Sequence, residues 1–402
     1  MQEFGLSKED IISRLGKLLK DDKNYDSGKI LGSMCTKPLS LAIKIYQDFF
    51  DKNLGDPGLF PATWAIERDV IKMISTLLNN PKGVGYCCSG GTEANLIAMR
   101  MARNSHDIKH PEIIVPISAH ASFDKAADLM NLHVIKVPLN EQYQADVEAV
   151  KSAISENTIA IVGIAGTTSL GVIDPIKELN EISLNNDIYL HVDAAFGGLV
   201  LPFLRKLGHK IPDFDFKLEG VRSITTDPHK MGMSPIGTGG IIFRDSSIMR
   251  ENSYEIPYLA GGNFKQATII GTRQGASVIA TWAIFKYLGI NGYAKIVKKC
   301  MNLTNILAKG IEKIDEVSLV IDPVINIVGF KSESLDINKI DHKLRKRGWA
   351  LGGFPEFLRV VVMPHIRKCH IDSFLSDLED ITHSMKSKKV EYRSKDTVKI
   401  TN

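Results

Sequence analysis

The sequence has no uninterrupted apolar run that approaches the roughly 18 residues a membrane-spanning helix requires. Its first stretch, MQEFGLSKEDIISRLGK, carries acidic residues early and has no apolar core, so we expect no secretory signal. An excess of one charge sign is also absent, because 50 Lys and Arg face 46 Asp and Glu and leave a formal net charge of +4. That charge is too small to indicate nucleic-acid binding. We therefore expect a cytoplasmic protein that binds neither membrane nor nucleic acid.

Cysteine is scarce, with five residues and no CxxC spacing. Adjacent Cys87 and Cys88 would lie on opposite faces of a strand, so they cannot form an ordinary disulfide. No Cys/His pair has the spacing of metal ligands, and we expect no metal site. Reduced thiols in a cytosolic protein are the simplest interpretation.

The remaining composition is that of a globular protein. Apolar residues make up 44%, charged residues 24% and aromatic residues 7% of the chain. These fractions exclude a disordered chain, a collagen-like chain and a disulfide miniprotein. A length of 402 residues allows about two or three domains.

Hydrophobic patterning predicts an α/β protein. An amphipathic helix is expected in SKEDIISRLGKLL, where Ser7 and Asp10 have the spacing of a capping box. From Gly83 onward, short apolar strands alternate with helices, which indicates a mostly parallel sheet covered on both faces. A β-α-β-α pattern near the end indicates a small α+β domain. The expected parts are an N-terminal helical arm (1–54), a large domain (55–290), a small C-terminal domain (291–386) and a basic tail (387–402).

The most informative segment is TTDPHKMGMSPIGTGG, residues 225 to 240. Lys230 follows a predicted strand end, and ligands of open α/β sheets bind at strand ends. A lysine held there can form a Schiff base with an aldehyde cofactor such as pyridoxal phosphate. A lone lysine is more often an exposed surface residue, so this segment needs support from others.

Asp193 supplies that support in HVDAAFGG, residues 191 to 198. A carboxylate at a strand end can keep the nitrogen of a pyridine ring protonated, and the ring then accepts electrons from the substrate. The alternative is an aspartate that caps a helix or closes a turn.

Two further segments fit the same cofactor. CCSGGTEAN, residues 87 to 95, joins a strand to a helix through two glycines, and backbone N–H groups at a helix start favour an anion such as phosphate. SAHASFDKA, residues 118 to 126, places His120 where a strand gives way to a helix, and its ring could stack on a planar cofactor. Each segment alone is also typical of an ordinary helix start.

Together these segments, in this order, resemble the pyridoxal-phosphate-dependent group II amino-acid decarboxylases, and in particular the archaeal L-tyrosine/L-aspartate decarboxylases. The resemblance extends from about Gly55 to Met385 and includes four more segments: GDPGLFP, AGTTSLGVIDPI, QATIIGTRQG and LRVVVMPHI. It implies the aspartate-aminotransferase-like fold (pyridoxal phosphate fold type I), pyridoxal 5'-phosphate as cofactor, and a homodimer with shared active sites.

The resemblance also implies residue roles. Lys230 would be the Schiff-base lysine, Asp193 would pair with the ring nitrogen, and His120 would stack on the ring. The remaining cofactor contacts would come from phosphate-binding Ser89, Gly90, Gly91 and Thr92, from Thr168 beside the phenolic oxygen, from Ala195 on the opposite ring face, from Asp227 and His229 before the lysine, and from Gly271 and Thr272 of the partner subunit.

The implied reaction is decarboxylation through a Schiff base and a quinonoid. The substrate would be L-tyrosine, giving tyramine for methanofuran, or L-aspartate, giving β-alanine for coenzyme A. Tyr258 is the preferred proton donor and Tyr254 the alternative, although either tyrosine can instead pack at a dimer interface. Arg359 could pair with the substrate carboxylate, since arginine offers a bidentate fork, or it could be an ordinary strand residue.

Other functions stay open at this point. Leu59, Phe60 and Trp64 are candidates for the walls of a substrate slot, but they can equally belong to the core. The same scaffold can carry a glutamate decarboxylase, a carbon–carbon lyase of the sphingosine-phosphate-lyase type or a desulfurase. A non-enzymatic binding protein that retains the fold is a further alternative.

Overall fold

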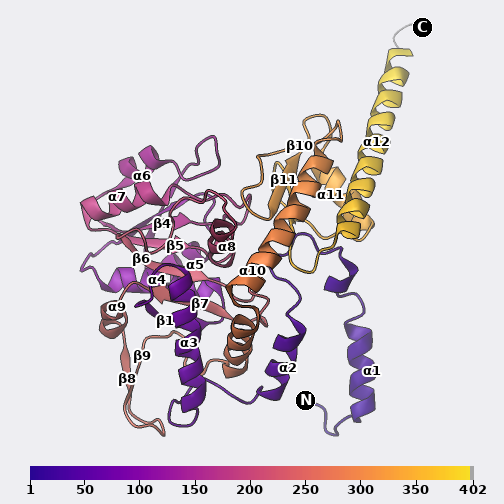
Figure 1. Cartoon of the computed structure of the whole chain (residues 1–402). Helices are drawn as coiled ribbons and strands as arrows, with labels where there is room; N and C mark the ends of the chain where they lie inside the picture. The colour runs from indigo at the N-terminus through magenta and orange to yellow at the C-terminus, as the bar shows by residue number, and fades with distance from the viewer. Residues whose placement is uncertain (399–402) are drawn as a thin grey trace.

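The computed structural model describes the chain from residue 1 to residue 398, with side chains up to residue 387 (Figure 1). The N-terminal part is helical and contains α1 (Lys8–Leu18), η1 (Tyr25–Ser27), α2 (Ser40–Asp48) and α3 (Pro61–Leu77). The hydroxyl of Ser7 accepts the backbone N–H of Asp10 at 3.0 Å, which confirms the predicted start of α1. No residue of α1 is buried.

A seven-stranded sheet forms the large part of the molecule. Its strands, in spatial order, are β1 (Val84–Cys88), β7 (Gly239–Phe243), β6 (Val221–Thr226), β5 (Tyr189–Asp193), β4 (Thr158–Ile164), β2 (Glu112–Pro116) and β3 (His133–Val137). Only β7 runs antiparallel to its neighbours. The prediction of a mostly parallel sheet is therefore confirmed.

Helices cover both faces of this sheet. One apolar cluster includes residues of α3, α7 (Ile176–Asn186), α8 (Leu201–Lys206) and α10 (Gly275–Ile311), and another includes α4 (Gly91–Asn104), α5 (Ser122–Met130) and α9 (Ser246–Glu251). Cys87 belongs to the first cluster and Cys88 to the second, so the two thiols lie on opposite faces as predicted. All five cysteines are free. Because both faces are covered, the inner strands β4 and β7 are buried along their whole length and are mainly apolar.

Helix α10 leads from the large sheet to a small antiparallel one (Figure 1). The small sheet has the order β10 (Ser318–Leu319), β11 (Ile327–Lys331), β13 (Leu358–Val361) and β12 (Gly352–Gly353), and it packs with α11 (Ile337–Lys346) and α12 (Lys368–Val398). Helix α10 is kinked at Gly289, whose φ of 53° and ψ of −172° suit glycine. We propose that this kink marks the expected domain boundary near residue 290.

The last helix, α12, extends away from the rest of the molecule toward the C-terminus (Figure 1). The expected basic tail begins at residue 387, so almost all its side chains lie outside the described residues. Within the described part of the chain, no helix is both long enough and apolar enough to cross a membrane.

Candidate active site

A cavity of about 300 Å³ lies at the edge of the large sheet where β1, β4, β5 and β6 end. Eleven residues that the sequence singled out line it: Ser89, Gly90, Gly91, Thr92, His120, Thr168, Asp193, Ala195, Asp227, His229 and Lys230. We call this space the cofactor cavity. Residues up to 141 positions apart in the chain meet here because the carboxyl ends of parallel strands share one edge.

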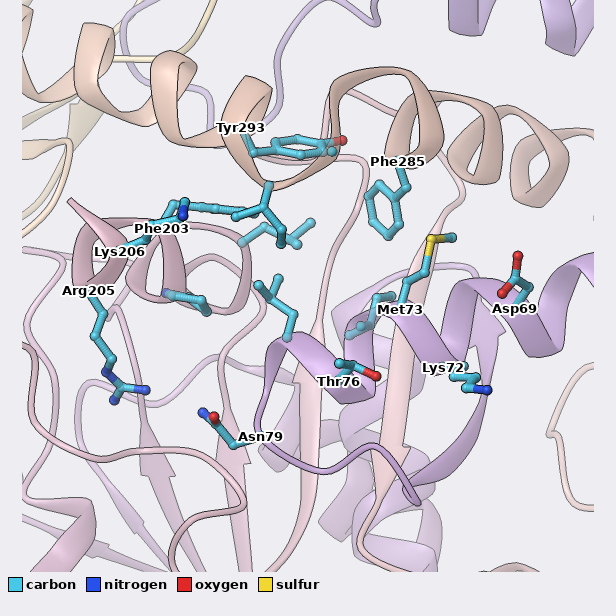
Figure 2. Close-up of a pocket in the computed structure, with 16 residues that line it drawn as sticks. Asp69, Lys72, Met73, Thr76, Asn79, Phe203, Arg205, Lys206, Phe285 and Tyr293 are labelled. Carbon is cyan, nitrogen blue, oxygen red and sulfur yellow. The ribbon is translucent and has the colours of Figure 1, made fainter.

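A second cavity lies elsewhere, between α3, α8 and α10 (Figure 2). It is larger, about 690 Å³, and aromatic rings of Phe203, Phe285 and Tyr293 form much of its wall. It shares no lining residue with the cofactor cavity. Its volume alone does not make it the reaction site, because the convergent polar groups are in the smaller cavity.

The start of α4 forms one wall of the cofactor cavity. A side chain at Gly91 would place its Cβ 2.9 Å from Asp227 Oδ2 and 3.2 Å from the Cβ of Ala195. Glycine therefore leaves open a space against the N-terminus of a helix, where backbone N–H groups and the helix dipole favour an anion. This geometry suits a phosphate group.

Lys230 lies in a turn after β6 and is held by carboxylates. Its Nζ is 3.1 Å from Asp227 Oδ2, and Nε2 of His229 is 3.6 Å from the same oxygen. Burial alone would lower the pKa of Lys230, but the carboxylates of Asp227 and Asp193 outweigh that effect and raise it. Burial lowers the pKa of His229. The free amine of Lys230 is therefore a cation at pH 7, and the ring of His229 is neutral.

The carboxylate of Asp193 is held from two sides. Its Oδ1 accepts the backbone N–H of Ala195 at 3.0 Å, and its Oδ2 accepts an amide N–H of Asn95 at 2.9 Å. The other amide N–H of Asn95 can donate to the Ser122 hydroxyl, 2.9 Å away. Both carboxylate oxygens thus have a defined direction at the end of β5.

A buried network fixes the Asn95 amide in turn. Its Oδ1 accepts the Thr225 hydroxyl at 2.7 Å and lies 3.1 Å from Nε2 of His191. Burial lowers the pKa of His191 to about 4, so its ring is neutral at pH 7. Asn95 was not among the predicted site residues. Its position one helical turn after Gly91 is the signal that places it on the same side of α4.

His120 and Thr168 also line the cofactor cavity. The His120 ring is exposed, and its Nδ1 accepts the backbone N–H of Ser122 at 3.2 Å. An exposed ring with one nitrogen occupied keeps a face free for stacking on a planar group.

Four predicted residues do not line the cofactor cavity of their own chain. Tyr258 is 83% exposed in the loop between β8 (Tyr254–Ile256) and β9 (Phe264–Gln266), and Gly271 and Thr272 are exposed as well. Arg359 is buried on β13, where its guanidinium donates to the backbone oxygens of Thr168 and Gly32. Burial lowers its pKa to about 10, and no described carboxylate forms an ion pair with it.

The possible slot residues Leu59, Phe60 and Trp64 also lie outside the cofactor cavity. Leu59 is 62% exposed, and the Trp64 ring packs edge-on against Phe264 with ring centroids 4.8 Å apart. Their segment contacts the Tyr258 loop instead, since Oδ2 of Asp56 accepts the backbone N–H of Ala260 at 2.7 Å.

The donor set fits pyridoxal phosphate. The polar atoms Asp227 Oδ1, His229 Nδ1 and Ser118 Oγ are buried without a hydrogen-bond partner among the described atoms, and buried polar groups are normally paired. A glycine-lined helix start suits the phosphate, Asp193 suits a protonated ring nitrogen, and Lys230 suits the aldehyde. No group of three or more His, Cys, Asp or Glu side chains in the described residues is arranged to hold a metal ion.

These features fit the class of enzymes that use pyridoxal phosphate on a lysine. The model of the pyridoxal-dependent decarboxylase conserved domain matches residues 33–333, and the chain belongs to this decarboxylase family. Its cofactor is accordingly pyridoxal phosphate, and its reaction class is that of a carboxy-lyase.

Two relatives show the extent of the similarity. The L-aspartate/L-glutamate decarboxylase of Pyrococcus horikoshii is 51% identical over 378 residues, which cover 94% of this chain and 98% of the relative. The probable L-tyrosine/L-aspartate decarboxylase of Methanothermobacter thermautotrophicus is 51% identical over 359 residues, covering 89% of this chain and 98% of the relative.

Solved structures confirm the fold. A sphingosine-1-phosphate lyase of Burkholderia pseudomallei matches with a TM-score of 0.89 and 29% identity, covering 100% of this chain and 97% of the other. A glutamate decarboxylase of Lactobacillus brevis matches with a TM-score of 0.86 and 24% identity, covering 95% and 94%. The expected fold of the pyridoxal phosphate decarboxylases, with its small C-terminal α+β part, is thus confirmed.

Proposed function

We propose that this chain removes the α-carboxylate of L-aspartate, L-tyrosine or both. The observation that supports it best is the convergence of Lys230, Asp193 and the Gly91 cradle at one sheet edge, in a chain about half identical to decarboxylases named for these substrates. Pyridoxal phosphate, when bound, supplies an aldehyde for the lysine and a ring that withdraws electrons from the substrate's α-carbon.

The chain's own residues prepare that chemistry. Asp193 holds a proton at the ring nitrogen. Its two carboxylate oxygens are already fixed by hydrogen bonds, so the carboxylate does not need to rearrange during the reaction. His120 and Ala195 line the same cavity, where His120 would cover one face of the bound ring and Ala195 the other. Lys230 needs to lose its proton before it can act as a nucleophile, and Asp227 is close enough to accept one.

Further contacts orient the cofactor. Ser89, Gly90, Gly91 and Thr92 would hold its phosphate at the start of α4, and Asp227 and His229 line the cavity with them. Thr168, which also lines the cavity, would lie beside the ring's phenolic oxygen.

Arg359 binds the substrate's α-carboxylate. A buried guanidinium without an ion-pair partner is costly, and a substrate carboxylate would satisfy its unpaired Nε. Because two backbone oxygens already hold the guanidinium, the carboxylate that binds it would have a set direction. Fixing that direction determines which bond of the α-carbon aligns with the ring.

The active enzyme is a homodimer with shared active sites. Tyr258, Gly271 and Thr272 lie at the surface of their own chain, which supports their action in a partner's site. Tyr258 would return a proton to the α-carbon, and Gly271 and Thr272 would contact the phosphate. The free cysteines support a cytoplasmic location.

Product analysis tests the proposed function. The purified chain is supplied with pyridoxal phosphate. It is then incubated separately with L-aspartate, L-tyrosine and L-glutamate, each labelled at the α-carboxyl carbon. We expect labelled carbon dioxide together with β-alanine or tyramine, and no release from Lys230→Ala. Cleavage of a phosphorylated amino alcohol without any carbon dioxide release would instead indicate the lyase reaction named for the Burkholderia structure.

A further inference from the structure

An apolar cavity of about 420 Å³ adjoins the cofactor cavity. The two share Ser118, His120 and Thr168 as lining residues, so the cavities meet at these three residues. The other lining residues are Ile117, Ala119, Ala121, Leu139, Tyr143, Ser169, Leu170, Phe354 and Phe357. We call this space the side cavity.

A short hairpin carries one wall of the side cavity. The rings of Phe354 and Phe357 are stacked, with centroids 4.7 Å apart and planes 9° from parallel. Both lie between β12 and β13, and the hairpin continues directly into Arg359, whose guanidinium is 5.6 Å from the centroid of Phe354. The same turn therefore positions Arg359, which is proposed to bind the α-carboxylate, and the rings of Phe354 and Phe357.

Tyr143 also lines the side cavity, and it is held in an unusual backbone conformation. Its φ is 59°, a left-handed value that is unfavourable for a residue with a side chain. Asn140 supports the turn, since its Oδ1 accepts the backbone N–H groups of Gln142 at 2.9 Å and Gln144 at 3.0 Å. The turn thus accepts strain while presenting an aromatic ring to the cavity.

The chemistry of the walls favours one kind of side chain. No lysine or arginine is among the side-cavity residues, so an acidic side chain would find neutral donors only. Aromatic rings and Leu139 and Leu170 instead offer stacking and apolar contact. Hydroxyl groups of Tyr143 and Ser169 offer partners for a polar ring substituent.

We propose that the side cavity receives the side chain of an aromatic L-amino acid substrate, with Phe354, Phe357 and Tyr143 as its specificity-determining residues. This inference rests on the proposed decarboxylase function and assigns the substrate class within it. It predicts a higher kcat/KM for L-tyrosine than for L-aspartate, by at least about tenfold.

Tyr143→Gly is the most informative variant. Glycine accepts a positive φ without strain, so the change removes the ring while the backbone keeps its conformation. We expect kcat/KM for L-tyrosine to fall about tenfold or more, with no drop in thermal stability. Phe357→Ala should have a similar effect, and Tyr287→Ala, which removes a ring 70% exposed on α10 and outside both cavities, serves as the matched control.

A binding measurement complements the kinetics. Tyramine and β-alanine are titrated separately into the cofactor-loaded protein by calorimetry, which needs no turnover. We expect tighter binding of tyramine than of β-alanine, and loss of that preference in Tyr143→Gly and Phe357→Ala.

The outcomes separate this inference from the proposed function. Decarboxylation of L-aspartate without L-tyrosine overturns the inference and leaves the proposed function standing. Decarboxylation of neither amino acid overturns the proposed function. Turnover of L-tyrosine that is unaffected by both ring-removing variants shows that the aromatic side chain binds elsewhere, and so overturns the inference.

Discussion

Asn95 donates an amide N–H to the carboxylate of Asp193 across 2.9 Å, and both side chains are buried at the edge of the large sheet. Four described partners occupy the Asn95 amide: Asp193, Ser122, Thr225 and His191. The amide therefore has a single favourable orientation, and it fixes a carboxylate that lines the cofactor cavity. A hydrogen bond to a charged group is worth about 1.5–3 kcal/mol.

Replacing Asn95 should therefore weaken cofactor binding. Asn95→Leu keeps a similar volume but removes the donor, and we expect about 10- to 100-fold weaker binding of pyridoxal phosphate. Titration followed by visible absorbance measures this affinity. Asn338→Ala, at an exposed position on α11, is the control. Unchanged affinity in Asn95→Leu would mean that the contact does not help Asp193 to hold the cofactor.

The stability of the fold should depend on His191 in acid. Burial lowers its pKa from 6.5 to about 4, so between these values the unfolded chain binds more protons than the folded one. The contribution of His191 to the free energy of unfolding is therefore fully present above pH 6.5. It is lost as the pH falls toward 4, and it amounts to at most about 3 kcal/mol.

Comparison with His191→Gln isolates that effect. Asp174 acts in the opposite direction, because burial raises its pKa from 3.8 to about 6 and folding then favours its protonated form. Since Asp174 is present in both proteins, the difference between them reports on His191. The free energy of unfolding of both proteins is measured with denaturant at pH 7 and pH 4.5. It should fall more in the wild type than in His191→Gln, and equal falls would contradict this assignment.

Arg359 should control substrate affinity. Arg359→Lys loses the forked geometry, and we expect the amino-acid KM to rise about tenfold or more while cofactor binding stays unchanged. Because burial lowers the pKa of Arg359 to about 10, the wild-type KM should also rise as the pH passes 10. Steady-state kinetics measure both effects, with Arg347→Lys at an exposed ion pair as the control. A change in kcat alone would argue against a carboxylate-binding role.

Tyr258 should act across the subunit interface. Tyr258→Phe and Lys230→Ala should each be inactive alone. In a hybrid dimer, one site would combine Lys230 of the first variant with Tyr258 of the second and would therefore be intact. A 1:1 mixture after subunit exchange should recover about a quarter of the wild-type specific activity. No recovery despite hybrid formation, shown with differently tagged chains, would place Tyr258 in its own subunit's site. The same mixture with Tyr254→Phe tests the alternative donor.

Much of the cofactor cavity could be predicted from the sequence, because its residues lie in short motifs at the ends of strands. Lys230, Asp193 and Gly91 each lie at or just after the end of a strand, and the parallel direction of those strands brings them to one edge. Ser7 likewise capped α1 as expected, since a cap depends on residues three positions apart.

The side cavity could not be predicted in this way. Tyr143, Leu170 and Phe357 come from three distant segments and meet only through the packing of the small sheet against the large one. The left-handed conformation of Tyr143 is equally hidden, because nothing in the identity of a tyrosine indicates a positive φ. Arg359 lies on a strand as the sequence pattern indicates, but the hydrogen bonds of its guanidinium depend on Thr168 and Gly32, which come from separate parts of the chain.

The central claim, that Lys230 carries the cofactor of this decarboxylase, can be tested by chemical trapping. Borohydride reduction of the loaded protein converts the link between cofactor and lysine into a stable bond, and peptide mass spectrometry then locates it. We predict a pyridoxyl mass on the peptide that contains Lys230, and no trapped cofactor in Lys230→Arg. A label on another lysine, or an unchanged label in the variant, would contradict the account.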